Sequence, residues 1–210
     1  LGNGLSIDAK LDLSEESIKG KFSLSNPNYK NSDKSIYTNI QSFETDRLKD
    51  FGYKTNKTGF TLGTQFEYYD DFYFGIGANS YYESIETDST ASVQQKKLKG
   101  NYFDNFINLN FDYDKRNQKF QPSQGFRNYF STDLPIVSET NTLANTFITT
   151  NYFEYFDSNI LKSSFYFRNS NSITGDNIKL SERLYLPSNR LRGFESGKVG
   201  PKDGNDFIGG

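Results

Sequence analysis

The side chains that most often carry acid–base and nucleophilic chemistry are scarce in this chain of 210 residues. Histidine and cysteine are absent, which removes the commonest general base and the thiol nucleophile. The adjacent acidic pairs at 15–16 and 70–71 stand in turn-like segments, where solvated carboxylates are expected. No serine is marked as activated, and the segment 203–206 lacks the spacing and the closing glutamate of a calcium loop. The sequence therefore predicts no enzyme activity, no metal site and no cofactor.

The composition is polar overall and yet rich in aromatic residues. Hydrophobic residues make up 34% of the chain, whereas 15 tyrosines and 20 phenylalanines raise the aromatic share to 17%. Disordered chains are poor in aromatic residues, and a soluble domain normally has a larger aliphatic core. A membrane β-barrel accommodates both features, because only its outer face must be apolar. The net charge of -2 gives no electrostatic reason to expect nucleic-acid binding.

Apolar and polar residues alternate with a period of two along most of the chain, as in strands with one buried face. Between Leu5 and Leu13, every second residue is apolar. The same alternation recurs at 18–24, 60–68, 72–79, 107–113 and 126–134, and more weakly at 35–43, 143–156 and 160–170. Several of these segments approach the roughly 9–11 residues that cross a bilayer at a tilt. No apolar run reaches the length of about 18 residues that a transmembrane helix needs.

The links between these segments tend to alternate in length. Those at 69–72 and 157–159 are tight, and those at 44–59, 87–101 and 171–205 are long. Outer-membrane barrels have the same pattern of short periplasmic turns and long external loops. We place all five prolines in links, because proline cannot donate to a strand ladder. Aromatic residues near the strand ends suit the girdle at a bilayer interface, although cross-strand aromatic pairing in a soluble sheet is the alternative.

The segment from Arg183 to Gly210 contains the most specific run of residues. Leu191-Arg192-Gly193-Phe194 is followed by Gly200-Pro201 and then by Gly209-Gly210. In this order the residues resemble the sixth external loop of the BamA/bacterial surface antigen family. That loop has a hydrophobic-Arg-Gly-Phe core, then Gly-Pro, then a Gly-Gly pair that opens the next strand. The resemblance implies that the loop, at about 171–206, folds back into the barrel lumen.

The resemblance also implies roles for three residues of this loop. Arg192 would pair with acidic groups on the inner wall, where a partly desolvated guanidinium binds carboxylates strongly. Gly193 would let the backbone turn or lie close to the wall, and Phe194 would wedge against lumen side chains. In the family the acidic partners lie on later strands, which we expect to fall outside this sequence.

A second match lies near the middle of the chain. Asp114, Arg116, Pro122 and Gly125 resemble the family's periplasmic turn, in which an Asp-x-Arg run leads to a Pro-x-x-Gly strand start. Residues 1–210 would then be one partial barrel domain, from the end of the second strand to the start of the twelfth of sixteen. We expect an all-β, antiparallel, incomplete transmembrane barrel of about nine to ten meandering strands, unable to close or function alone.

The resemblance implies a function without bond chemistry in the bacterial outer membrane. The intact protein would assist the folding and insertion of β-barrel proteins. Its partners would be the lipid bilayer, unfolded outer-membrane proteins and accessory assembly lipoproteins, with no nucleic acid. A TamA-like assembly factor and a two-partner-secretion translocation pore stay open as alternatives, because the barrel motifs do not separate them. The Arg192 loop argues against a simple diffusion porin.

Overall fold

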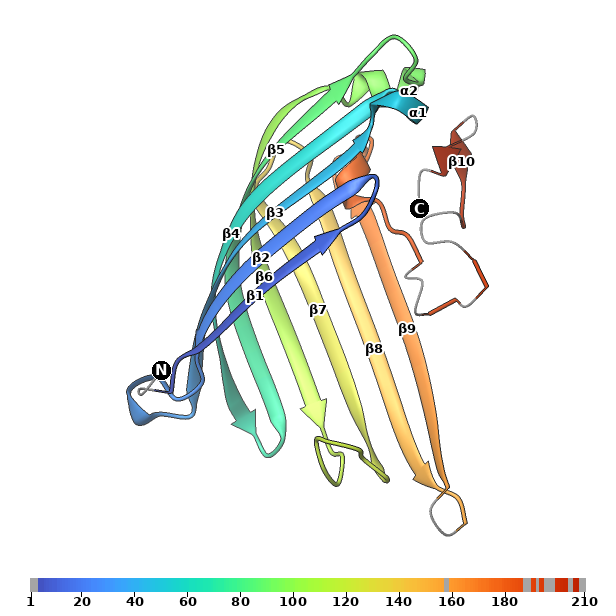
Figure 1. The fold of residues 1–210 in the computed structure, drawn as a ribbon. Helices are drawn as coiled ribbons and strands as arrows, with labels where there is room; N and C mark the ends of the chain where they lie inside the picture. Colours follow the sequence, from blue (N-terminus) through green and yellow to red (C-terminus); the bar gives the residue numbers. More distant parts are fainter. Residues whose placement is uncertain are drawn as a thin grey trace.

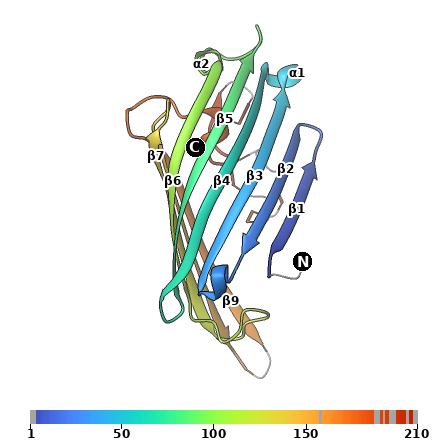
Figure 2. The same cartoon turned by 90° about the vertical axis from the view of Figure 1, so that its left-hand side faces the viewer.

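The computed structural model describes residues 4–156, 159–186, 190–191, 193–194, 199–203 and 206–207. Within these residues, nine strands form one antiparallel sheet in which each strand pairs with its neighbours in the chain, from β1 to β9. Figures 1 and 2 show that this sheet is strongly curved, with the segment that follows β9 on its concave side. The predicted all-β, antiparallel, incomplete barrel is confirmed.

The main strands are β1 (Ser6–Leu13), β2 (Ser17–Asn26), β3 (Lys34–Arg47), β4 (Tyr53–Tyr69), β5 (Phe72–Thr87), β6 (Gly100–Asp114), β7 (Gly125–Val137), β8 (Thr142–Glu154) and β9 (Ile160–Ser172). Short helices lie in the links, namely η1 (Tyr29–Asn31), α1 (Leu48–Phe51), α2 (Val93–Lys97) and η2 (Leu180–Glu182). A separate two-stranded ladder joins β10 (Lys202–Asp203) to β11 (Asp206–Phe207). In the described part of the chain, no helix has the length and apolar character to cross a membrane.

The two faces of the sheet differ in composition, because the strand register keeps each set of alternate residues on one side. Large apolar side chains are exposed on the convex face, among them Ile7, Leu11, Phe22, Ile40, Phe60, Leu62, Ile76, Phe103, Leu134 and Phe167. Polar side chains occupy the concave face, among them Gln41, Lys57, Asn79, Glu83, Asp104, Asp112, Asp133 and Arg168. Exposing so many apolar side chains to water costs free energy, so the convex face is stable only in an apolar environment.

The link predicted at 44–59 is much shorter than the sequence pattern suggested. β3 continues to Arg47 and pairs there with Tyr53 at the start of β4, so only α1 and Gly52 separate the two strands. Gly52 has a φ of 76°, the left-handed conformation that ends the helix. The strand extensions are polar on the convex face, where Lys54 Nζ lies 2.8 Å from a carboxylate oxygen of Glu44. Strand pairing thus continues beyond the apolar band, the part of the sheet whose convex face is apolar. Outside this band, apolar and polar residues need not alternate along a strand.

Pro135 does not lie in a link, contrary to the sequence-based placement. It lies inside β7 opposite Phe106, next to an irregularity in the register at Asn105 and Phe106. The pairing of β7 with β8 ends at Asp133 and Ala144. Pro135 therefore occupies the frayed end of the strand, where its missing N–H costs least. Pro187 lies outside the described residues.

Candidate functional site

The segment after β9 returns to the concave face of the sheet and buries Leu180 there. Leu180 packs against Tyr53 of β4, Ile85 of β5 and Leu98, and all four side chains are buried. The partly buried rings of Phe51 and Tyr102 pack around this cluster. The site lies at the end of the sheet that carries α1 and α2, which we call the loop end (Figure 1). The opposite end, with the tight β4–β5 connection, is the turn end.

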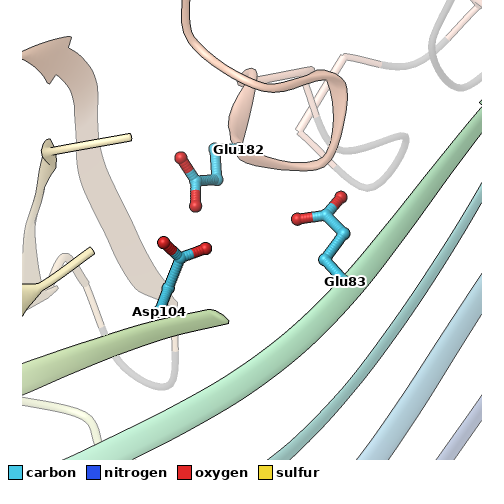
Figure 3. Close-up of side chains that lie close together, drawn as sticks. All are labelled: Glu83, Asp104 and Glu182. Carbon is cyan, nitrogen blue, oxygen red and sulfur yellow. The ribbon is translucent and has the colours of Figure 1, made fainter. Parts of the chain in front are cut away.

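Lys179, the residue before Leu180, is completely buried and binds three carboxylates. Its Nζ donates a hydrogen bond to Asp104 of β6, and lies 3.3 Å from Glu83 Oε2 of β5 and 3.2 Å from Glu182 Oε1. Lys57 of β4 adds a second ammonium group, 3.8 Å from Glu83 and 3.7 Å from Glu182. Figure 3 shows the three carboxylates pointing toward one another. We call these five residues the Lys179 cluster.

Charge balance explains why a buried lysine remains an ammonium ion in this site. Burial alone lowers the pKa of Lys179, but the nearby carboxylates of Glu182, Glu83 and Asp104 outweigh it and hold the pKa above its usual range. The ring of Tyr102 adds a cation–π contact at 5.0 Å from Nζ. Both oxygens of Glu83 and of Glu182 lack a hydrogen-bond partner among the described residues. Their stabilisation is therefore mainly coulombic and depends on the ammonium groups staying in place.

The three carboxylates also have the spacing of a metal-binding group, with one oxygen of each within 4.8 Å of the others. Lys179 Nζ contacts all three of them, so the lysine supplies the cation. The chemistry of this arrangement is electrostatic attachment of one segment to another.

Asp104 connects three elements through its two carboxylate oxygens. Ser138 Oγ and the Glu139 N–H donate to Oδ1 at 2.5 Å and 3.1 Å, while Lys179 binds Oδ2. Ser138 and Glu139 belong to the link between β7 and β8. One side chain of β6 thus holds two links at the loop end. Sequence reasoning missed this role, and the only available signal was an acidic residue at an inward-facing strand position.

The residues singled out in the 191–201 segment are placed only in part. Arg192 lies outside the described residues, so its pairing with the inner wall stays a prediction. Gly193 and Gly200 have φ values of 87° and 130°, conformations that favour glycine. Leu191 is half-buried, Phe194 is exposed and Pro201 lies outside regular structure. The predicted roles of Gly193 and Phe194 stay predictions as well.

The turn motif forms a compact clasp at the turn end. Arg116 donates to both oxygens of Asp114, from Nε at 2.7 Å and from Nη2 at 2.6 Å. This pairing raises the pKa of Arg116 further above its already high value. Gly125 has a φ of 96°, and a Cβ atom there would lie 2.1 Å from the Lys115 carbonyl oxygen. Pro122 lies in the same link between β6 and β7.

A curved antiparallel sheet, apolar outside and polar inside, with a loop returning to its concave face, is the architecture of a transmembrane β-barrel wall. The family model described as the Omp85 superfamily domain matches residues 1–210. The chain therefore belongs to the Omp85 superfamily, and the family predicted from the loop and turn motifs is confirmed. A comparison with curated proteins gives no match.

Among the solved structures that match is the crystal structure of BamA from Haemophilus ducreyi lacking POTRA domains 1–3. The TM-score is 0.78 with 18% sequence identity, over 100% of this chain and 46% of that one. At this identity the likeness establishes a shared barrel fold. The chain spans less than half the length of that structure.

Proposed function

We propose that this chain is part of the barrel of an outer-membrane protein assembly factor, which assists the folding and insertion of other β-barrel proteins. The observation that carries the proposal is the Omp85 superfamily match over all 210 residues. The two-faced sheet supports it, because an apolar convex face fits lipid and a polar concave face fits an aqueous lumen. The bacterial outer membrane is the location that this assignment implies.

Strand length is consistent with a membrane-spanning wall. A strand of 13 residues, such as β7, β8 or β9, extends roughly 43 Å at about 3.3 Å per residue. At a tilt of about 40°, it would cover roughly 33 Å along the membrane normal, close to the hydrocarbon thickness of about 30 Å. We place the loop end outside the cell and the turn end in the periplasm, since external loops are the longer ones in this class.

The proposed activity breaks no covalent bond. A strand edge that is weakly paired in the intact barrel would template an incoming strand through backbone hydrogen bonds. The nine strands described above would form a stable section of the wall, and the loop after β9 would lie in the lumen. The partners would be lipid, unfolded outer-membrane proteins and accessory lipoproteins. A TamA-like factor and a secretion pore share these barrel features.

Depletion of the full-length protein in its own bacterium separates these functions. Quantitative mass spectrometry of the outer membrane should show that many unrelated barrel proteins decline together. Re-expression of the wild-type protein should restore them, which controls for indirect effects of depletion. Loss of a single secreted partner, with the other barrels unchanged, would refute the assembly role in favour of a secretion pore.

A further inference from the structure

The segment 173–186 reaches across the sheet to meet its partners. Lys179 follows the end of β9 by seven residues, but its wall partners Glu83 and Asp104 lie on β5 and β6. The distance from β9 to β6 is three strand spacings, roughly 14 Å, and seven extended residues reach up to roughly 24 Å. Chain connectivity therefore permits this docking without imposing it. Specific contacts must hold the segment against β5 and β6.

Hydrophobic burial and ion pairing both hold the segment here, but only the ion pairs depend on its exact position. Burial of Leu180 against Tyr53 and Ile85 favours docking, but hydrophobic burial has little directional preference. Lys179 binds one carboxylate on each of two wall strands. It is fully buried, and a buried ammonium ion is tolerated only where partners surround it. The ion pairs therefore set the position at which the segment docks.

We propose that the Lys179 cluster is an electrostatic latch that fixes the segment after β9 against the inner wall, and that Lys179 is its positioning residue. The latch needs only β4, β5 and β6 as its wall. It is thus separate from any contact that Arg192 makes with later strands. The latch itself stands on the geometry alone, whereas its importance for assembly rests on the proposed function. In the assembly factor it would define where the lumen loop starts.

The charge balance of the cluster distinguishes a latch from ordinary packing. Three carboxylates (Glu83, Asp104, Glu182) face two ammonium groups (Lys57, Lys179), so the net charge is -1. Replacing Lys179 with methionine changes the net charge to -2 and leaves carboxylates facing one another. Replacing Glu182 with glutamine brings the net charge to zero. A latch predicts opposite outcomes for these two substitutions, whereas a general loss of packing predicts damage from both.

Tryptic cleavage after Arg183 in the full-length protein in proteoliposomes measures docking directly. Arg183 is half-buried, and its Nε donates to the Ile178 carbonyl oxygen within the docked segment. Mass spectrometry should show that Lys179→Met accelerates cleavage at this bond by about tenfold or more, because the segment leaves the wall. Glu182→Gln should retain the protection, and Lys179→Arg should retain part of it. Lys97→Met, on the exposed surface of α2, is the matched control and should cleave like the wild type.

An unchanged cleavage rate in Lys179→Met would overturn the latch, as would equal acceleration in Glu182→Gln. If Lys179→Met fails to fold, the double variant Lys179→Met/Glu182→Gln decides, because it restores the net charge of -1 and leaves the hydrogen bonds of Asp104 with Ser138 and Glu139 in place. Recovery of heat-modifiable gel mobility in the double variant supports the latch, and failure to recover overturns it. Barrel insertion is assayed separately with the same proteoliposomes. Wild-type protein that shows Arg183 protection but no insertion would refute the proposed function and leave the latch standing.

Discussion

Lys179 donates a hydrogen bond to Asp104 although the two residues lie 75 positions apart in the sequence. Asp104 also accepts hydrogen bonds from Ser138 and Glu139 in the link between β7 and β8. A single inward-facing carboxylate on β6 therefore organises the loop end of the sheet. Its removal should affect both links at once, which makes it a sensitive point for mutation.

Asp104→Asn is expected to destabilise the folded barrel by about 2–4 kcal/mol, because it removes the carboxylate to which the buried ammonium of Lys179 donates its hydrogen bond. It also weakens the hydrogen bonds that Asp104 accepts from Ser138 and Glu139. The free energy of unfolding is measured by urea titration of the full-length protein in lipid vesicles, with the folded fraction read from heat-modifiable gel mobility. Asp12→Asn is the matched control, since Asp12 is exposed and its ion-pair partner among the described residues is Lys10, also exposed on β1. Equal stability of the two variants would contradict the role assigned to Asp104.

Gly125→Ala should destabilise the turn end by about 1–3 kcal/mol, since the new Cβ would meet the Lys115 carbonyl oxygen and the residue has a positive φ. The same unfolding experiment measures this effect. Gly20→Ala is the control, because a Cβ at Gly20 meets nothing within 4 Å and its φ lies outside the positive range that disfavours alanine. A neutral Gly125→Ala would show that the β6–β7 link does not require the conformation seen here.

The latch should tolerate alkaline conditions. The pKa of Lys179 in the folded protein lies above the ordinary lysine value of 10.5, so its stabilising effect is complete below that value and fades only as pH rises through the folded pKa. Cleavage after Arg183 should therefore be constant between about pH 7 and pH 10, after correction for trypsin activity on a reference peptide. Faster cleavage already near pH 8 would mean that Lys179 is not held as an ammonium ion.

The strands were predictable where one face meets an apolar environment. The segments 5–13 and 72–79 alternate strictly, and the structure places them in β1 and β5. The first residues of β4, from Tyr53 to Gly59, were taken for a link. Lys54, Asn56 and Thr58, which share the convex face, are all polar, so the segment has no apolar residue at every second position despite the buried ring of Tyr53.

The site was less predictable than the fold. The clasp residues Asp114, Arg116 and Gly125 are close in sequence, so a local motif could point to them. Lys179 and its wall partners come from three distant segments, and only the sheet register and the return of the chain bring them together. A single sequence carries no local pattern that indicates a contact between such distant segments. Arg192 was singled out by resemblance alone and stays a prediction.

The accessibility of spin labels along β3 to oxygen and to a water-soluble nickel chelate tests the central claim that this sheet is a lipid-embedded wall with one face toward water. The chain contains no cysteine, so single cysteines at positions 36–41 can be spin-labelled without competing sites in this region. With the full-length protein in lipid vesicles, collision with oxygen should be strongest at Ile36, Thr38 and Ile40. Collision with a water-soluble nickel chelate should be strongest at Tyr37, Asn39 and Gln41. A uniform profile, or high nickel accessibility at both Ile40 and Asn39, would contradict the account.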